Sequence, residues 1–271
     1  PVSLIVSAFA PVTDVRGHLT PELKRIDEPS YLLLVDLGRG RNRLGGSCLA
    51  QAFKRAGGAV PDVDDADALA ALFAAVQELN SRDMLLAYHD RSDGGLFAAV
   101  AEMLFAGRLG VSLQVAGSGD ALLGALFAEE IGAVMQVAKS KLTQVQMVLD
   151  RHGVTAEAIG RIEDTPRLVV RGDDMVVLDL DRRTLQREWS EMSYRMQALR
   201  DNALTAKEAF DAVLDDDDPG LNVSLTFDPN DDISRPYRGG SGQPRVAILR
   251  EQGVNSQYEM AAAFLRAGFA P

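Results

Sequence analysis

LLAYHDRSDGGLFAAVAEMLFA, residues 85–106, is the stretch of the sequence that decides the fold. Its apolar start predicts a short strand at residues 85–88, and its alanine-rich end predicts a helix to about residue 106. The polar loop between them, residues 89–95, ends in a pair of glycines. A strand that leads through a loop into a helix is the unit from which folds with alternating strands and helices are built.

The same alternation continues along the chain and indicates an α/β or α+β fold. Further strands are predicted at residues 4–10, 31–37, 111–115, 133–137, 159–162, 168–171, 176–180 and 245–249. Further helices are predicted at residues 47–56, 64–79, 121–127, 141–152, 181–214 and 257–267. Asp64 or Asp65 suits the N-cap of the helix at 64–79, and Gly268 suits the end of the last helix.

Composition divides the chain into residues 1–181, a helical connection at 182–227, a linker at 228–244 and a final segment at 245–271. The linker is rich in Pro, Gly and Asp, which is typical of extended connections. The final strand and helix have no sheet of their own, and a parallel strand must be covered on both faces. We therefore expect the protein to continue beyond Pro271; the alternative is that this strand joins the edge of the preceding sheet.

Charge and cysteine content narrow the class of protein. The net charge is −11, and phosphate contacts need clustered basic side chains, so we expect no nucleic-acid partner. Small phosphorylated ligands remain compatible with this charge, because backbone amides and a divalent cation can hold them. No apolar run approaches the ~18 residues of a membrane helix, and no secretory signal is evident. With Cys48 as the one cysteine, we expect a cytoplasmic protein without an internal disulfide.

The loop HDRSDGG, residues 89–95, carries the clearest chemistry. Free N–H groups at a helix start attract anions, and Gly94 and Gly95 let phosphate oxygens approach the backbone. Ser92 offers a hydroxyl donor, and Asp90 and Asp93 offer the hard oxygen ligands that Mg²⁺ prefers. A magnesium-nucleotide site is one interpretation; a helix cap and turn without a ligand is the other.

Structural interpretations are preferred for the remaining polar motifs. The glycine loop at residues 44–47 fits no nucleotide fingerprint, so we expect tight packing with Ser47 as a helix cap. Cys48 stands at a helix start without a visible base, which favours a buried structural thiol. Glu129 and Glu130 are expected at a helix end and a solvated turn, and the aspartate run at 215–218 is expected to be solvated. The three histidines lie far apart without cysteine partners, which argues against zinc.

The motifs together resemble the large formylglycinamide ribonucleotide amidotransferases (phosphoribosylformylglycinamidine synthases) along essentially the whole chain. The resemblance rests on PVSLIVSAFA (1–10), LGGS (44–47), AYHDRSDGGL (87–96), LFAEEIGAV (126–134), RDN (200–202), DPGLNV (218–223) and VAILREQGVNS (246–256). It implies that residues 1–181 form the C-terminal subdomain of the second synthase half, with a fold like that of aminoimidazole ribonucleotide synthetase. Residues 245–271 would then be the opening strand and helix of a class I glutaminase domain.

The resemblance also implies a chemistry. The family is an ATP-dependent carbon–nitrogen ligase of purine biosynthesis that converts formylglycinamide ribonucleotide to formylglycinamidine ribonucleotide with ATP and glutamine. Asp90 matches a Mg²⁺ ligand and Ser92 a nucleotide contact at an auxiliary ATP/ADP site, with Gly94 and Gly95 as further candidates. The upstream synthase half and the downstream glutaminase, which holds the catalytic Cys, His and Glu beyond Pro271, would be parts of the same polypeptide. The segment alone is therefore expected to be inactive.

Two other interpretations compete with this one. Selenophosphate synthetases and thiamine-phosphate kinases share the superfamily, but they lack an attached glutaminase, so the segment at residues 249–256 speaks against them. The other alternative is a structural module whose bound nucleotide braces the fold and takes no part in catalysis.

Overall fold

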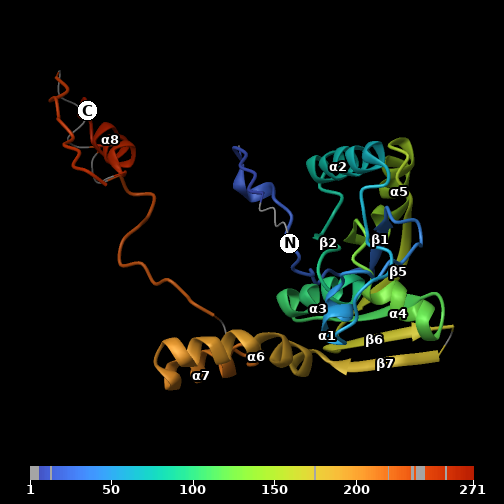
Figure 1. Ribbon diagram of the computed structural model, residues 1–271. Coiled ribbons are helices and arrows are strands. Elements are labelled where there is room, and N and C mark those ends of the chain that lie inside the picture. Colours follow the sequence, from blue (N-terminus) through green and yellow to red (C-terminus); the bar gives the residue numbers. More distant parts are fainter. Residues whose placement is uncertain are drawn as a thin grey trace. The chain divides into compact units, whose positions relative to one another are not determined.

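The computed structural model describes residues 6–12, 14–173, 175–218, 220–232, 235, 242–253 and 255–271. The chain forms two compact units, Pro1–Asp217 and Asp218–Pro271. The first unit holds a sheet and most of the helices (Figure 1).

A seven-stranded sheet organises the first unit, in the order β2-β4-β1-β5-β3-β6-β7. Neighbouring strands are antiparallel, except that β3 and β6 are parallel. This mixed sheet confirms the predicted α/β or α+β class and the strands predicted from residue 31 to residue 180. The strands are β1 (Ser30–Asp36), β2 (Ala87–Asp90), β3 (Gly110–Val115), β4 (Gly132–Ala138), β5 (Ala156–Glu163), β6 (Arg167–Gly172) and β7 (Met175–Asp181).

Strand β1 is apolar along its length because both of its faces are covered. Successive side chains of a strand point to opposite faces. Leu32 packs into one hydrophobic cluster, and Leu33 and Val35 pack into a second cluster on the other face. All three side chains are buried, which explains the continuous apolar run that predicted this strand.

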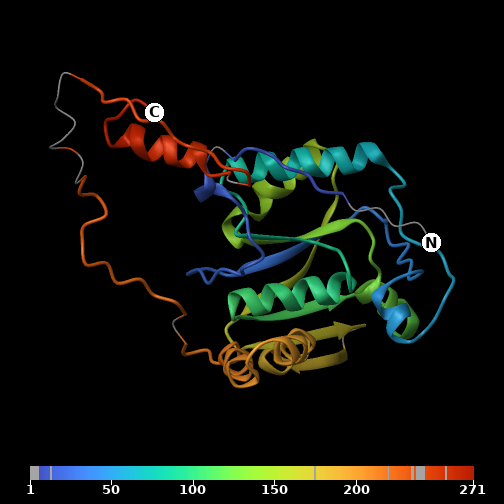
Figure 2. The ribbon, with the colours of Figure 1, turned by 60° about the vertical axis from the view of Figure 1, so that its left-hand side comes forward.

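Helices cover the two faces of the sheet (Figure 2). Helices α2 (Ala66–Ser81) and α5 (Leu142–Arg151) lie over one face, and α3 (Gly95–Gly107) and α4 (Gly119–Phe127) lie over the other. Of the two predicted N-cap candidates, Asp65 is the N-cap of α2, and its side chain accepts a hydrogen bond from Ala68 N at 3.0 Å. Short 3₁₀ turns lie at η1 (Val15–Gly17) and η2 (Lys139–Lys141).

Three predicted elements differ from the structure in extent. Helix α1 is short (Cys48–Ala52), although Ser47 caps it as predicted. The helix predicted at 181–214 is two helices, α6 (Arg182–Arg200) and α7 (Ala203–Ala212), because Asn202 caps a new helix by accepting from Leu204 N and Thr205 N. The strand predicted at 4–10 is wrong for residues 6–10, which form no strand, while residues 4–5 lie outside the described residues.

The aspartate run at 215–218 is not uniformly solvated, contrary to expectation. Asp216 is half-buried and accepts hydrogen bonds from Arg182 and Arg183, the latter at 2.6 and 2.8 Å. The side chain of Arg182 is fully buried at the start of α6. A buried guanidinium needs a charged partner, so Asp216 has a structural role.

In the second unit, helix α8 (Gln257–Arg266) confirms the helix predicted at 257–267. Gly268 follows it with a left-handed φ of +92°, as its predicted place at the helix end requires. The strand predicted at 245–249 is wrong for this structure, which has an isolated parallel bridge between Arg245 and Ala270. A strand forms when it pairs along its length with another strand. Among the described residues of this unit, the segment at 245–249 has this one bridge, to Ala270.

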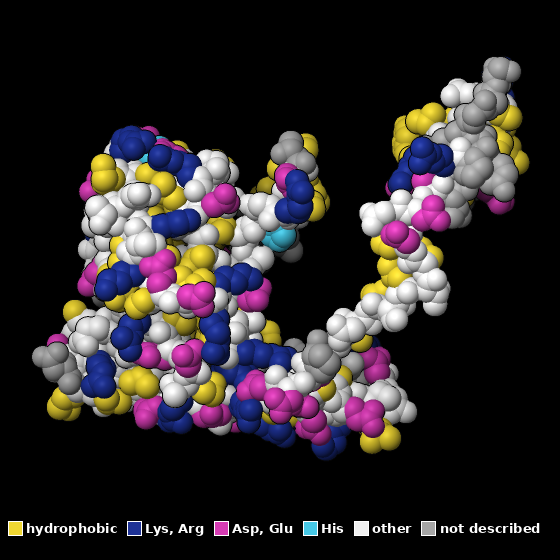
Figure 3. All heavy atoms as spheres, turned by 180° about the vertical axis from the view of Figure 1, so that it is seen from behind, with side chains coloured by type: hydrophobic (Ala, Val, Ile, Leu, Met, Phe, Trp, Pro, Cys, Tyr) yellow, Lys and Arg dark blue, Asp and Glu magenta, His cyan; other side chains and the backbone are white. Residues whose placement is uncertain are grey.

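Within the described residues, each helix is too short or too polar to cross a lipid bilayer. Figure 3 shows acidic and basic side chains interspersed over the sheet unit on the face in view. The excess of acidic residues in the sequence is therefore not gathered into one patch on this face.

Gly110, at the start of β3, packs closely against the main chain at Thr165, and this contact can be tested. A Cβ at this position would lie 1.8 Å from Thr165 O, so backbone would have to move. We expect Gly110→Ala to lower the free energy of unfolding of the sheet unit by about 3 kcal/mol, the upper end of overpacking costs. Gly17→Ala is the matched control, since a Cβ there meets no atom within 4 Å. Urea unfolding followed by circular dichroism measures both, and equal midpoints for the two variants would contradict the packing of β3.

Candidate functional site

The loop between β2 and α3 brings the predicted site residues together. Asp90 ends β2, and its side chain is 67% exposed. The Ser92 hydroxyl donates to Asp90 Oδ2, and Gly95 N–H donates to Ser92 O at 2.9 Å. The loop therefore presents an exposed carboxylate and a hydroxyl side by side, on a turn closed by its own backbone.

The two glycines of this loop have a packing requirement of their own. Gly94 and Gly95 have left-handed φ values of +78° and +67°. A Cβ at Gly95 would lie 2.8 Å from the carbonyl oxygens of Leu126 and Ala128. The close approach that the sequence suggested for a phosphate is thus made here by the end of α4.

Glu129 supplies a carboxylate at the start of two helices. Its Oε1 accepts hydrogen bonds from Cys48 N at 2.8 Å and from Gly94 N at 2.9 Å. These amides stand at the starts of α1 and α3, where the helix dipole favours negative charge. A protein carboxylate therefore already occupies part of the anion position predicted at the start of α3.

Glu130 is fully buried, so the expectation of a solvated turn for the Glu129–Glu130 pair is wrong. Its two carboxylate oxygens accept from Arg43 Nε at 2.8 Å and from an Arg43 terminal nitrogen at 2.7 Å. Arg43 N–H adds a bond of 2.9 Å, and Arg43 also pairs with Asp64 at 2.7 Å. The Arg43 hydrogen bonds hold the pKa of the Glu130 carboxyl below its usual value. Glu130 thus fixes the loop between β1 and α1, residues 37–47, through Arg43.

Arg91 joins the two loops from the other side. It is 5% exposed, and its Nε donates to Glu130 O at 2.7 Å. Its terminal nitrogen donates to Asp36 Oδ1, while the same carboxylate accepts from Gly38 N at 2.9 Å and Gly40 N at 2.7 Å. Arg91 is therefore a structural member of the HDRSDGG motif, whereas Asp90 and Ser92 face solvent.

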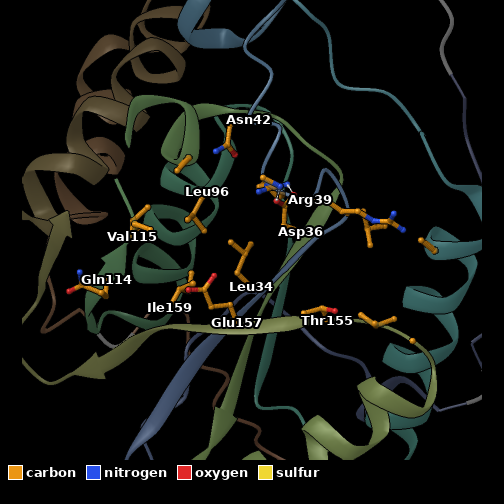
Figure 4. A pocket seen from close by; sticks show the side chains of 18 residues that line it. Leu34, Asp36, Arg39, Asn42, Leu96, Gln114, Val115, Thr155, Glu157 and Ile159 are labelled. Carbon is orange, nitrogen blue, oxygen red and sulfur yellow. Dashed lines mark hydrogen bonds and ion pairs between the residues drawn. The ribbon is translucent and has the colours of Figure 1, made fainter. Parts of the chain in front are cut away.

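A cavity of about 580 Å³ lies beside this network (Figure 4). Leu34, Leu96 and Ile159 supply apolar walls, and Asp36 and Arg91 of the network also line it. Asp90 and Ser92 do not line it. No local sequence pattern indicates this cavity, because its walls come from strands and loops that are far apart along the chain.

Cys48 is exposed, so the prediction of a buried thiol is wrong. Partial burial of the sulfur and the neighbouring Glu129 carboxylate nevertheless raise the pKa of this thiol. The ligand atoms of Cys48, Asp93 and Glu129 lie within 4.8 Å of one another. Of the two aspartates suggested as Mg²⁺ ligands, Asp93 belongs to this group and Asp90 does not. The raised thiol pKa agrees with an unreactive Cys48.

Comparison with known families places this fold. Residues 31–173 match the family described as AIR synthase related protein, C-terminal domain. Residues 243–271 match the CobB/CobQ-like glutamine amidotransferase domain. Since the first match covers more than half of the chain, the chain belongs to the AIR synthase related family. The two matches, in this order, support the resemblance to the large phosphoribosylformylglycinamidine synthases.

Two solved structures from Thermotoga maritima share the fold. PurL complexed with ATP is 13% identical, with 63% of this chain and 27% of that chain covered at a TM-score of 0.50. The PurLQS structure is also 13% identical, with 63% of this chain and 28% of that chain covered at a TM-score of 0.50. The chain thus spans about a quarter of the length of these structures, which at this identity are similar to it in fold alone.

The Glu130–Arg43 pair generates a stability prediction. We expect Glu130→Gln to lower the free energy of unfolding at pH 7 by about 2–3 kcal/mol, because Arg43 loses its buried charged partner. Glu191→Gln, which removes one partner of an exposed pair with Arg195, should cost less than about 0.5 kcal/mol.

The same variant has an expected pH dependence. Because the folded-state pKa of Glu130 lies below the usual 4.5, its stabilisation is present above about pH 4.5 and is lost as pH falls through the folded-state pKa. The gap in stability between wild type and Glu130→Gln should therefore narrow below pH 4.5. Urea melts at a series of pH values measure this gap, and a gap that stays constant would contradict the assignment.

Proposed function

We propose that this chain is part of an ATP- and glutamine-dependent ligase that converts formylglycinamide ribonucleotide to formylglycinamidine ribonucleotide in purine biosynthesis. The observation that carries the proposal is the joining, in one chain, of an AIR synthase related domain and a glutamine amidotransferase segment. A ligase that replaces an amide oxygen by nitrogen needs a source of ammonia, and a glutaminase supplies it. ATP would activate the amide oxygen of the substrate, and ammonia would then displace phosphate.

In this reaction, the loop after β2 would bind the nucleotide. The exposed Asp90 carboxylate offers a hard oxygen donor of the type that Mg²⁺ prefers, so it fits the metal. Mg²⁺ bound there would neutralise phosphate oxygens of ATP or ADP. Ser92 stands next to this carboxylate and would contact the nucleotide through its hydroxyl. The similar T. maritima PurL forms a complex with ATP, which supports a nucleotide here.

A second candidate function is that the nucleotide of this half braces the structure and is not consumed. Glu129 favours it, because this carboxylate already takes the Gly94 amide that would otherwise receive a phosphate oxygen. Gly94 and Gly95 would then shape the loop, leaving Asp90 and Ser92 as the contacts. The proposal assigns no residue of this chain to glutamine hydrolysis.

The nucleotide assignment is tested by removing the two exposed donors. We expect Asp90→Asn to weaken MgADP binding about tenfold or more, equivalent to about 1.4 kcal/mol, and Ser92→Ala to weaken it less. Binding to the folded state alone raises the melting temperature, so this rise should be smaller in both variants. Titration calorimetry and thermal melts measure these effects. Asp67→Asn, an exposed aspartate on α2, is the control and should bind as wild type.

The catalytic and bracing candidates separate in the protein that carries this chain. Supplied with formylglycinamide ribonucleotide, ATP and glutamine, it should form formylglycinamidine ribonucleotide. If the nucleotide at Asp90 braces the fold, Asp90→Ala lowers nucleotide retention and thermal stability more than the rate per folded molecule. A large rate loss at unchanged stability would exclude the bracing function, and no product with wild-type protein would overturn the ligase proposal.

A further inference from the structure

A chain of side-chain contacts runs from the loop at Asp90 to helix α6. Trp189, in α6, donates its Nε1–H to Glu102 Oε1 at 3.0 Å. Its ring also packs against Phe105, with ring centroids 5.7 Å apart. Glu102 and Phe105 both belong to α3, which packs against α6. The contact therefore ties α6 to the helix that begins at the HDRSDGG loop.

The second oxygen of Glu102 continues the path. Glu102 Oε2 lies 3.0 Å from His89 Nε2, and the other ring nitrogen, Nδ1, lies 2.7 Å from Asp90 O. The His89 side chain is 16% exposed, so its ring is held between α3 and the end of β2. Both ring nitrogens thus lie within hydrogen-bonding distance of an acceptor oxygen, and the ring links Glu102 to the main chain of Asp90.

We propose that Glu102 and His89 are positioning residues that couple the conformation of the Asp90–Ser92 loop to helix α6 through Trp189. The coupling to a ligand rests on the proposed function, since it takes Asp90 and Ser92 as the nucleotide contacts. Helix α6 follows β7 directly and precedes the segment of the second unit along the chain. A change at the loop would therefore be transmitted to α6, and a change at α6 would return to the loop, because coupling is reciprocal.

The chain contains a single tryptophan, so the proposal has a direct spectroscopic reporter. Its indole N–H bonds to Glu102, and any movement of that carboxylate changes the environment of the fluorophore. We expect MgADP to change the emission of Trp189 with the same dissociation constant that calorimetry gives. In Glu102→Gln the change should be reduced about fivefold or more, and MgADP should bind about fivefold more weakly.

Glu188→Gln is the matched control. It removes the same charge beside the fluorophore, from an exposed residue of α6 with no contact to His89 recorded in the structure. It should keep both the emission change and the affinity of wild type. If Glu102→Gln kept the emission change and the MgADP affinity of Glu188→Gln, the coupling would be overturned.

A measurement without nucleotide separates this proposal from the proposed function. Amide hydrogen exchange of residues 89–92 should be about fivefold faster in Glu102→Gln and Trp189→Phe than in wild type or Glu188→Gln. Thermal melts establish that each variant is folded at the temperature of the measurement. Faster exchange without any MgADP binding supports the coupling and counts against the nucleotide site. Unchanged exchange together with Asp90-dependent MgADP binding overturns the coupling and leaves the nucleotide site standing.

Discussion

The site depends on one buried ion pair, between the carboxylate of Glu130 and the guanidinium of Arg43. An ionised carboxylate without a partner is costly to bury, so its place beside β4 requires the two-pronged contact with Arg43. That contact fixes the glycine loop after β1, and Arg91 fixes the loop after β2 by donating to Glu130 O. The two loops are therefore held to one point at the start of β4, and neither can move far without disturbing the other.

Glu129 extends this arrangement to the helices. Glu130 places its carboxylate in the interior, and the preceding residue, Glu129, places its carboxylate at the starts of α1 and α3. The helix dipoles of both helices are thus met by the protein's own charge. This shifts the expected ligand chemistry of the loop from backbone amides, which the glycines suggested, to the side chains of Asp90 and Ser92.

The sequence was informative where neighbours along the chain decide the structure and uninformative where distant residues do. The strand at residues 31–37 and the N-caps Ser47 and Asp65 follow from apolar runs and local hydrogen bonds, and the structure confirms them. The burial of Glu130 depends on Arg43, 87 residues away, and no local pattern reveals such a partner. The same holds for the cavity lined by Leu34 and Ile159, while the break at Asn202 was a local cap signal that the long helical pattern concealed.

Helix α6 is held to the rest of the sheet unit over its first half, from Arg182 to Trp189. At its start, the fully buried Arg182 and its neighbour Arg183 share the carboxylate of Asp216, which returns the chain to the beginning of α6 after α7. Farther along, Trp189 meets α3 through Glu102 and Phe105. A helix that was only a spacer would need neither contact. Since both contacts are made by polar groups with defined geometry, α6 has a fixed place on the sheet unit, and a fixed helix can carry a displacement of the Asp90 loop where a flexible linker would absorb it.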